Sequence, residues 1–370
     1  MPSLLRHFIG TAVVLLVICS HSGVPASGLP LQLQPAMYAH FIDVGQADCT
    51  LLEFPCGVIL IDAGTQSDER TAGLITQLEH FFAGRPDLDE TIDTVFITHS
   101  HIDHTRALRE IAERFTIHNI IDNGHATHSG GADQRWIMAE AEAGRLGINI
   151  RHVSDAEVTT LPHRRGLTDA AIDPLNCGDC DPVIRILAAS YDENPGWPSG
   201  DFENENNHSL VIRVDFEESS FLFSGDLQEQ SIETLVEYYQ GTDTLDIDIH
   251  QVGHHGSHNA TTREFLEAMT PHAAIISMGY WEFGRQPDGS VLPFSTFRYG
   301  HPRAEIVELL EEEIPGYRSR RTIAMAARGS RDFVEYTVRK RVYATGWDGT
   351  IRVRATPTRD YRITVNHQGF

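Results

Sequence analysis

The segment Thr98–His104, with the sequence THSHIDH, holds the densest group of potential metal ligands in this chain of 370 residues. Imidazole and carboxylate groups are the usual protein ligands of zinc, manganese and iron. His99 and His101 alternate in an extended turn, so we expect both to face one ion. Asp103 and His104 follow where the chain turns into a predicted helix, and we expect them to face a second ion.

Two more groups of polar residues follow predicted strands, as the first group does. Asp226 comes directly after the strand predicted over 220–223, where its carboxylate can bridge two ions or, alternatively, cap a helix. His254 and His255 stand between glycines after the strand predicted over 246–252. Together the three strand ends predict a site for two divalent cations, zinc or manganese, about 4 Å apart.

The elements that must position these residues alternate between strands and helices. Short apolar runs bounded by turn residues predict strands, and longer amphipathic stretches predict helices. Helices are predicted over 69–82, 105–115, 132–145, 227–239, 261–269 and 302–313. Strands are predicted over 37–43, 50–54, 58–62, 94–98, 117–122, 183–189, 210–215, 220–223, 246–252 and 273–277, with short strands after residue 313. This alternation is typical of an α/β fold.

These motifs, in this order, resemble the metallo-β-lactamase superfamily and, within it, the extracellular nuclease domain of ComEC-type competence proteins. Besides the THSHIDH segment and Gly225-Asp226, the resemblance rests on FIDVGQAD at 41–48, LIDAG at 60–64, NNHSL at 206–210, GHHGS at 253–257, YGHP at 299–302, and the tail segments 342–345 and 348–351. Order and spacing match from about residue 37 to 365. The DVGQ, HHGS and GHP elements are the ones more specific to the ComEC-like branch.

The resemblance implies a four-layer αββα sandwich with the metal ions at one rim of its two sheets. It implies that His99 and His101 hold one ion and that Asp103 and His104 hold the other. Asp226 is expected between the two ions, and His254 as the last histidine ligand. The role of His255 is left uncertain. Asp62 is expected to orient the ligand imidazoles from behind.

The resemblance also implies the catalytic roles. Asp103 or Asp226 is expected to hold an attacking hydroxide, and His301 to protonate the leaving oxygen or to steady the scissile phosphate. The third ligand of the first ion stays open, because either His208 binds it or Asn207 supports the site through its amide. The sequence departs from the branch where Arg106-Ala107 stands in place of Gly-Gly and Ala47 in place of Gly.

The composition and length of the chain are compatible with a folded α/β domain. Apolar residues make up 41% of the chain and charged residues 22%, which excludes a disordered or collagen-like protein. Residues 315–370 hold 12 Lys and Arg against four Asp and Glu, whereas the whole chain has a formal charge of −23. This basic segment predicts either a surface that faces a polyanion or a set of arginines paired with the acidic remainder.

The N-terminus predicts export. Arg6 and His7 precede an apolar run over 8–19, and Val24-Pro25-Ala26 gives small residues before a cleavage point near Ala26. We interpret residues 1–26 as a signal peptide and 27–370 as one hydrolase domain, secreted or periplasmic, with no membrane span in the mature chain. A retained membrane anchor is the alternative.

Four cysteines follow the predicted signal peptide: Cys49, Cys56, Cys177 and Cys180. Export permits disulfides, and four cysteines allow three pairings. Because Cys177 and Cys180 lie three residues apart in a stretch rich in Asp, Pro and Gly, we predict a local disulfide or a surface loop there.

The function predicted from these residues is a secreted, metal-dependent nuclease or phosphodiesterase that uses a hydroxide activated by two metal ions, with nucleic acid or another phosphodiester as substrate. One alternative is a metallo-hydrolase of a lactam, lactone or thioester, which would share the metal motif. Another is a non-catalytic component of a DNA-uptake or surface assembly. The sequence does not indicate the oligomeric state.

Overall fold

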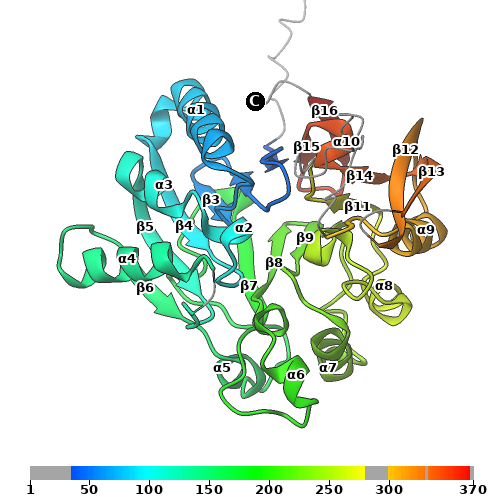
Figure 1. The fold of residues 1–370 in the computed structure, drawn as a ribbon. Helices are drawn as coiled ribbons and strands as arrows, with labels where there is room; N and C mark the ends of the chain where they lie inside the picture. The colour runs from blue at the N-terminus through cyan, green and yellow to red at the C-terminus, as the bar shows by residue number, and fades with distance from the viewer. Residues whose placement is uncertain (1–34, 128, 280–298, 330–331, 367–370) are drawn as a thin grey trace, which may run out of the picture. The chain divides into compact units, whose positions relative to one another are not determined.

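The computed structural model describes residues 35–127, 129–279, 299–329 and 332–366, and residues 35–370 form one unit. Within this unit two β-sheets face each other, and helices cover the outer side of each (Figure 1). The layers therefore run helix, sheet, sheet, helix, which confirms the predicted αββα sandwich. The predicted signal peptide lies outside the described residues.

The first sheet has the strand order β16-β15-β1-β2-β3-β4-β5-β6. Its strands are β1 Met37–Phe41, β2 Thr50–Glu53, β3 Val58–Ile61, β4 Thr91–Phe96, β5 Thr116–Asp122, β6 Asn149–His152, β15 Thr350–Ala355 and β16 Tyr361–Asn366. The pairs from β3 to β6 are parallel, and parallel neighbours need crossover connections. Those connections supply α1 (Asp68–Gly84), α2 (Ile102–Thr105), α3 (Leu108–Arg114) and α4 (Gly131–Glu142).

The second sheet has the order β14-β11-β10-β9-β8-β7. Its strands are β7 Pro182–Ala188, β8 Val211–Phe216, β9 Ser219–Phe223, β10 Ile249–Gln251, β11 Ala273–Ile276 and β14 Val342–Ala344. On its outer side lie α7 (Glu229–Tyr239), α8 (Arg263–Met269) and α9 (Ala304–Glu313), which Figure 1 shows on the opposite side of the molecule from α1, α3 and α4. The inner core between the sheets includes Phe41 and Phe96 from the first sheet and Phe221 and Ile275 from the second.

Shorter elements connect these layers. They are α5 Asp155–Thr159, α6 Ser199–Phe202, α10 Thr345–Asp348 and the 3-10 turns η1 Pro86–Leu88, η2 Gly178–Cys180, η3 Glu205–His208 and η4 Gly253–Gly256. In the described part of the chain, no helix combines the length and apolar composition that crossing a membrane requires.

The chain after α9 differs from the prediction of short strands. β12 (Tyr317–Gly329) and β13 (Asp332–Lys340) pair as a long two-stranded antiparallel sheet. Ile323, Met325 and Val338 are buried, whereas Thr322, Val334 and Arg339 are exposed. Charged residues, such as Arg320 and Arg321 in β12 and Glu335 in β13, interrupt the apolar pattern and hide the length of the strands.

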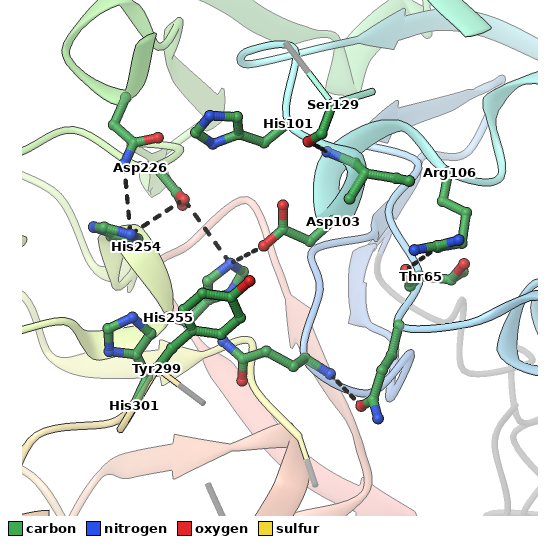
Figure 2. Close-up of a pocket in the computed structure, with 14 residues that line it drawn as sticks. Thr65, His101, Asp103, Arg106, Ser129, Asp226, His254, His255, Tyr299 and His301 are labelled. Atoms are coloured by element: carbon green, nitrogen blue, oxygen red, sulfur yellow. Dashed lines mark hydrogen bonds and ion pairs between the residues drawn. The ribbon is translucent and has the colours of Figure 1, made fainter. Parts of the chain in front are cut away.

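The loops that follow β3, β4, β9 and β10 meet at one rim of the two sheets, and this rim carries the predicted ligands (Figure 2). Carboxyl ends of parallel strands share one edge of a sheet, so residues distant in sequence converge there. Asp226 follows β9 and His255 follows β10, whereas His99 and His104 follow β4.

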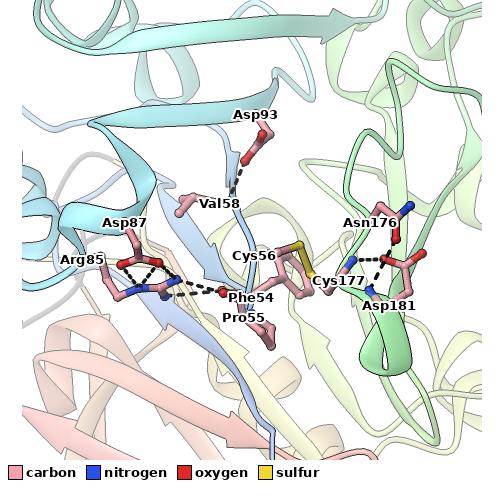
Figure 3. The surroundings of a disulfide bond; sticks show 11 residues. Phe54, Pro55, Cys56, Val58, Arg85, Asp87, Asp93, Asn176, Cys177 and Asp181 are labelled. Atoms are coloured by element: carbon pink, nitrogen blue, oxygen red, sulfur yellow. Dashed lines mark hydrogen bonds and ion pairs between the residues drawn. A yellow bond between two sulfur atoms is a disulfide. The ribbon is translucent and has the colours of Figure 1, made fainter.

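The cysteines do not form the local disulfide that we predicted between Cys177 and Cys180. Cys177 instead bonds to Cys56, 121 residues earlier, with their Cα atoms 5.2 Å apart (Figure 3). The turn between β2 and β3 carries Cys56 to the loop that precedes β7, where the backbone N–H of Cys177 donates to Asp181 Oδ1. Cys49 and Cys180 carry free thiols. Sequence proximity misled the prediction because tertiary packing brings the more distant partner closer.

Candidate metal centre

Asp62 organises the loop that carries most of the predicted ligands. It follows β3 with φ 56°, a left-handed conformation that aspartate tolerates better than most residues. Its Oδ1 accepts a hydrogen bond from the Thr98 backbone N–H at 2.8 Å, and its Oδ2 accepts one from Thr98 Oγ1 at 2.8 Å. His104 Nδ1 donates to the same Oδ2 at 2.7 Å. This contact turns the other ring nitrogen of His104, Nε2, toward the rim.

One set of ligand atoms, which we name group one, consists of His99, His101 and Asp226. His99 Nε2 lies 3.0 Å from His101 Nδ1 and 3.7 Å from Asp226 Oδ2. All three donor atoms lie within 4.8 Å of one another, a spacing that suits ligands around a single cation. The structure thus brings together the residues that were predicted for the first ion, together with the predicted bridging aspartate.

A second set, group two, consists of Asp103, His104 and His255. His255 Nε2 lies 3.4 Å from Asp103 Oδ2, and the Nδ1–H of the same ring donates to the Ser277 carbonyl at 2.7 Å. Asp226 joins the two groups, because its Oδ1 lies 3.3 Å from His104 Nε2 while its Oδ2 faces His99. The carboxylate expected between two ions therefore lies between two sets of donors.

The pKa values of group two reflect its carboxylates. Burial disfavours the charged imidazolium of His104, but Asp226 and Asp62 outweigh burial and raise the pKa of His104. For His255, burial is outweighed by Asp226 and Asp103, and the pKa rises to about 9. Burial would raise the pKa of a carboxyl group, yet these histidines hold the pKa of Asp103 and Asp226 below its usual range. Without a cation, the histidines of group two are therefore charged.

Group one behaves differently. Burial and the neighbouring charge of His104 lower the pKa of His99 well below its usual range, so its imidazole is neutral. A neutral imidazole presents a lone pair to a cation without first losing a proton.

Several buried atoms at this rim lack hydrogen-bond partners among the described residues. They are His104 Nε2, Asp226 Oδ1 and His255 Nε2, which have only ion-pair contacts, 3.3 Å between His104 and Asp226 and 3.4 Å between His255 and Asp103. Buried polar atoms are normally hydrogen-bonded, so three such atoms at one place require an explanation. Bound divalent cations would satisfy all three, and nitrogen and carboxylate donors suit zinc or manganese. The residues fit the metal ions that the motif predicts.

Of the two adjacent histidines after β10, the structure places His255, and not His254, among the donor atoms. His255, left uncertain, belongs to group two, whereas the predicted ligand His254 belongs to neither group. His254 Nε2 lies 3.8 Å from Asp226 Oδ2 and 3.5 Å from Asn206 Nδ2. Both histidines have positive φ, 46° and 53°, so the backbone turns sharply and directs the two rings differently. The distances therefore favour His255 as the last ligand.

The structure also shows what His208 and Asn207 contact. His208 Nε2 donates to the Phe202 carbonyl at 2.7 Å, and its Nδ1 accepts from the Tyr191 backbone N–H, so both ring nitrogens are engaged. These bonds hold its ring in an aromatic cluster, and His208 belongs to neither group of donor atoms. Asn207 accepts hydrogen bonds from Gln228 N and Ser231 Oγ at the start of α7.

A cavity of about 250 Å³ opens above the two groups (Figure 2). His301 lines it at 8% exposure, with its ring centroid 5.2 Å from that of His254 and 6.5 Å from that of His255. Pro302 was predicted to start a helix, but α9 begins two residues later at Ala304. The cavity is also lined by residues to which the sequence assigned no role: Gln46, Thr65, Gln66, Arg106, Ser129, Asn206 and Tyr299. Of these, Gln46, Arg106, Asn206 and Tyr299 are positions in or beside the motifs that the sequence analysis named.

Asp48 is a further buried acid that the sequence did not single out. With Asp62 and His104 it forms a third group of closely spaced donor atoms. Burial and the charge of Asp62 raise the pKa of Asp48 to about 7, and Gln251 Nε2 donates to its Oδ1. Because Asp62 already bonds to Thr98 and His104, we interpret this third group as support behind the ligands.

The fold and the donor groups define a known class. A family model described as the metallo-beta-lactamase superfamily matches residues 42–280, more than half of the chain, so the chain belongs to that superfamily. Among curated proteins, it is 26% identical to ComE operon protein 3 of Bacillus subtilis (strain 168), over 73% of this chain and 30% of that protein. It is 30% identical to competence protein ComA of Neisseria gonorrhoeae, over 32% of this chain and 18% of that protein. The matches confirm the ComEC-type resemblance, and each spans less than a third of the relative's length.

Solved structures with the same fold are more distant. Human tRNase Z, short form, has a TM-score of 0.37 and 11% identity, covering 64% of this chain and 91% of that chain. The metallo-beta-lactamase fold protein YhfI from Bacillus subtilis has a TM-score of 0.37 and 9% identity, covering 65% and 85%. Neither likeness bears on the substrate of this chain.

Proposed function

We propose that this chain is an exported, metal-dependent phosphodiesterase that cleaves nucleic acid. One observation carries the proposal: Asp226 lies between two groups of histidine and aspartate donors beneath a cavity large enough for a phosphodiester. The competence proteins among its relatives support nucleic acid as the substrate. The predicted signal peptide supports export.

The cations would be held by His99, His101 and Asp226 on one side and by Asp103, His104 and His255 on the other, with Asp226 shared. When bound, two such cations lower the pKa of a water molecule toward neutrality and offset the charge of a phosphodiester. Because the pKa of Asp103 lies below its usual range, its carboxylate stays ionised at neutral pH. It can then accept a hydrogen bond from the attacking water and orient it.

Arg106 supports an anionic substrate. Its side chain lines the cavity, and its Nε–H donates to the Thr65 carbonyl at 3.0 Å (Figure 2). This bond holds the planar guanidinium at the cavity wall, where its Nη1 also lies 3.5 Å from Asp68 Oδ1. A guanidinium binds phosphate oxygens through charge-assisted hydrogen bonds, whereas a neutral lactone or thioester gains little from it.

His301 is suited to the leaving group. Burial, together with the neighbouring His254 and His255, lowers the pKa of His301, so its ring is neutral in the free protein. An anionic phosphate placed beside it favours the protonated ring. The protonated ring can then donate a proton to the departing oxygen. We therefore propose His301 as the general acid.

The function is tested by assaying the protein, loaded with Mn²⁺ or Zn²⁺, on DNA, RNA, bis(p-nitrophenyl) phosphate, nitrocefin and a lactone. We expect cleavage of the phosphodiesters only. Turnover of nitrocefin or the lactone without phosphodiester cleavage would support the alternative hydrolase. No turnover of any substrate by metal-loaded protein would contradict an enzymatic role.

The role of His301 has its own test. His301→Ala should keep its metal content and lose about 10²–10⁴-fold in the rate of DNA cleavage, the usual scale for removing an acid catalyst. The loss should be smaller on bis(p-nitrophenyl) phosphate, because p-nitrophenolate leaves without a proton. The exposed His258, outside the cavity, provides the matched control as His258→Ala. Loss of a metal equivalent in His301→Ala would make this residue a ligand instead.

A further inference from the structure

The outer side of the first sheet carries a row of arginines that the candidate centre does not use. In β1 and β15 the odd-numbered residues face the inner core, so the even-numbered residues face outward. Tyr38 of β1 pairs with Arg354 of β15, which pairs with Arg362 of β16, and Arg352 lies one pleat away on the same side. The Arg352 guanidinium lies over the Tyr38 ring, 5.2 Å from its centroid. We name these four residues the arginine face.

The face is open to solvent. Helix α1 packs over β2 and β3 through Leu74 and Leu78, and the strands β15 and β16 extend the sheet beyond it. Arg352 and Arg362 are exposed, and Tyr38 and Arg354 are half-buried. A groove of about 380 Å³ runs beside the face, lined by Arg352, Thr364 and Asn366 from the sheet and by His80 and Phe81 from α1.

The charges of this face have no carboxylate partner among the described residues, unlike those of two other arginines in the basic segment. Arg318 forms an ion pair with the buried Asp348 at 2.6 Å, and Arg359 forms one with Asp248 at 2.6 Å. Among the described residues, the three arginines of the face form no ion pair with a carboxylate. The nearby Glu53 is already bound by His40 and Arg85. The basic segment therefore contains arginines that are paired with carboxylates and arginines that are not.

The pairing of β15 with β16 places two arginines of the face side by side, which destabilises the sheet when no anion is bound. Arg354 and Arg362 are directly opposite on neighbouring strands, where like charges repel. The formal charge of the whole chain is −23, so an exposed group of arginines with no partner stands out from the remainder. Phosphates bound across the pair would offset the repulsion, and a half-buried tyrosine provides a surface on which a base can stack.

We propose that the arginine face and its groove bind a single strand of nucleic acid whose continuation enters the catalytic cavity; this rests on the proposed function. β1 leads from Tyr38 directly to the loop that carries Gln46 to that cavity. The Asp43 N–H in this loop donates to Thr350 Oγ1, so the start of β15 adjoins the same loop. From Tyr38 to Asp43 the chain covers about 17 Å in extended conformation. A strand with the stacked spacing of duplex DNA, about 3.4 Å per nucleotide, needs about five nucleotides for that distance, and a more extended single strand needs fewer.

The test compares a fluorescent single-stranded 20-mer with a dinucleotide and bis(p-nitrophenyl) phosphate on the full metal-loaded chain. Arg354→Gln/Arg362→Gln should weaken 20-mer binding about tenfold and reduce the salt slope by about 1.4, because each phosphate contact on a single strand contributes about 0.7. Hydrolysis of the dinucleotide and of bis(p-nitrophenyl) phosphate should not change. Both substrates are too short to reach the arginine face from the cavity.

The matched control is Arg320→Gln/Arg339→Gln, which removes two exposed arginines of the same basic segment from β12 and β13. Equal weakening in both variants would mean that only total charge matters and would overturn the proposal, as would unchanged or absent 20-mer binding. If Arg354→Gln/Arg362→Gln binds the 20-mer normally but no longer binds anionic phospholipid vesicles, the arginine face is a lipid-binding surface and the proposal is overturned. If the 20-mer result holds while no phosphodiester is cleaved, the binding face stands and the proposed catalytic function fails.

Discussion

The two ligand groups of the candidate centre share Asp226 but differ in how they are held. Two of the three residues in group one come from a single loop after β4, His99 and His101. Asp103 and His104 of group two come instead from α2. Each group adds one residue from the second sheet, which is Asp226 after β9 in group one and His255 after β10 in group two. The imidazoles of group two are each fixed through Nδ1, His104 by Asp62 and His255 by the Ser277 carbonyl.

The groups also differ in charge. Group two is surrounded by Asp62, Asp103 and Asp226, which raise the pKa of its histidines, whereas burial leaves His99 in group one neutral. Excess carboxylate charge and anchored rings favour a cation in group two. The comparison therefore teaches that two sites that share a bridging carboxylate need not be equivalent, and we expect group two to bind its cation more tightly.

Substitution of Asp226, the carboxylate shared by the two groups, should have the largest effect on metal binding and activity. Asp226→Ala removes the carboxylate that faces both His99 and His104, so we expect weak binding of both cations. The rate of phosphodiester cleavage should fall at least about 10³-fold, beyond the loss for a single electrostatic stabiliser. Metal content by mass spectrometry and kcat on bis(p-nitrophenyl) phosphate measure these effects. Retention of two tightly bound metal ions would show that the carboxylate is not shared.

A second substitution separates the adjacent histidines. His255→Ala should lose one metal equivalent, that of group two, whereas His254→Ala should keep both, because only His255 lies among the donors. Metal content of the two purified variants, dialysed side by side, gives the answer. The reverse result would restore His254 as the ligand and contradict the order that the distances favour.

A third substitution acts behind the ligands. Asp62→Asn keeps a side chain that tolerates the left-handed backbone at φ 56°, but it removes the carboxylate that binds His104. We expect about 10–100-fold weaker metal affinity, the usual effect of losing such a partner. The loss should fall on group two, which competition with a fluorescent chelator resolves as a change in one of two dissociation constants. An equal change in both would mean that Asp62 supports the loop as a whole.

The smallest expected effect is the difference between the two groups in the pH dependence of metal binding. A histidine binds a cation only when neutral, so group two must release protons whose pKa is raised, to about 9 for His255. Its affinity should fall as the pH drops below about 9, and cation uptake at pH 7 should release about one proton or more. Group one, with the pKa of His99 lowered, should show neither effect. Calorimetry of the metal-free protein in buffers of different ionisation enthalpy measures the release, and equal release from both sites would contradict the comparison.

Much of the fold was predictable because its signals are local. Strands such as β3 and β11 are apolar runs, and THSHIDH carries its ligands within one short segment. Strand ends in an α/β fold lie at a common edge, so the convergence of Asp226 with that loop also followed from the pattern. The length of β12 and β13 did not follow, because charged residues such as Arg320, Arg321 and Glu335 interrupt their apolar pattern.

By itself, the sequence determined the α/β sandwich, the two-metal motif and the family to which the chain belongs, since each depends on residue types at short spacing. Only the tertiary structure decided which of His254 and His255 faces the ligands, because a backbone turn with positive φ sets the direction of each ring. It also decided that Cys177 pairs with Cys56 and that His208 is engaged elsewhere. The arginines divide into paired and unpaired sets for the same reason: contact between distant segments depends on packing, and packing is a property of the whole chain.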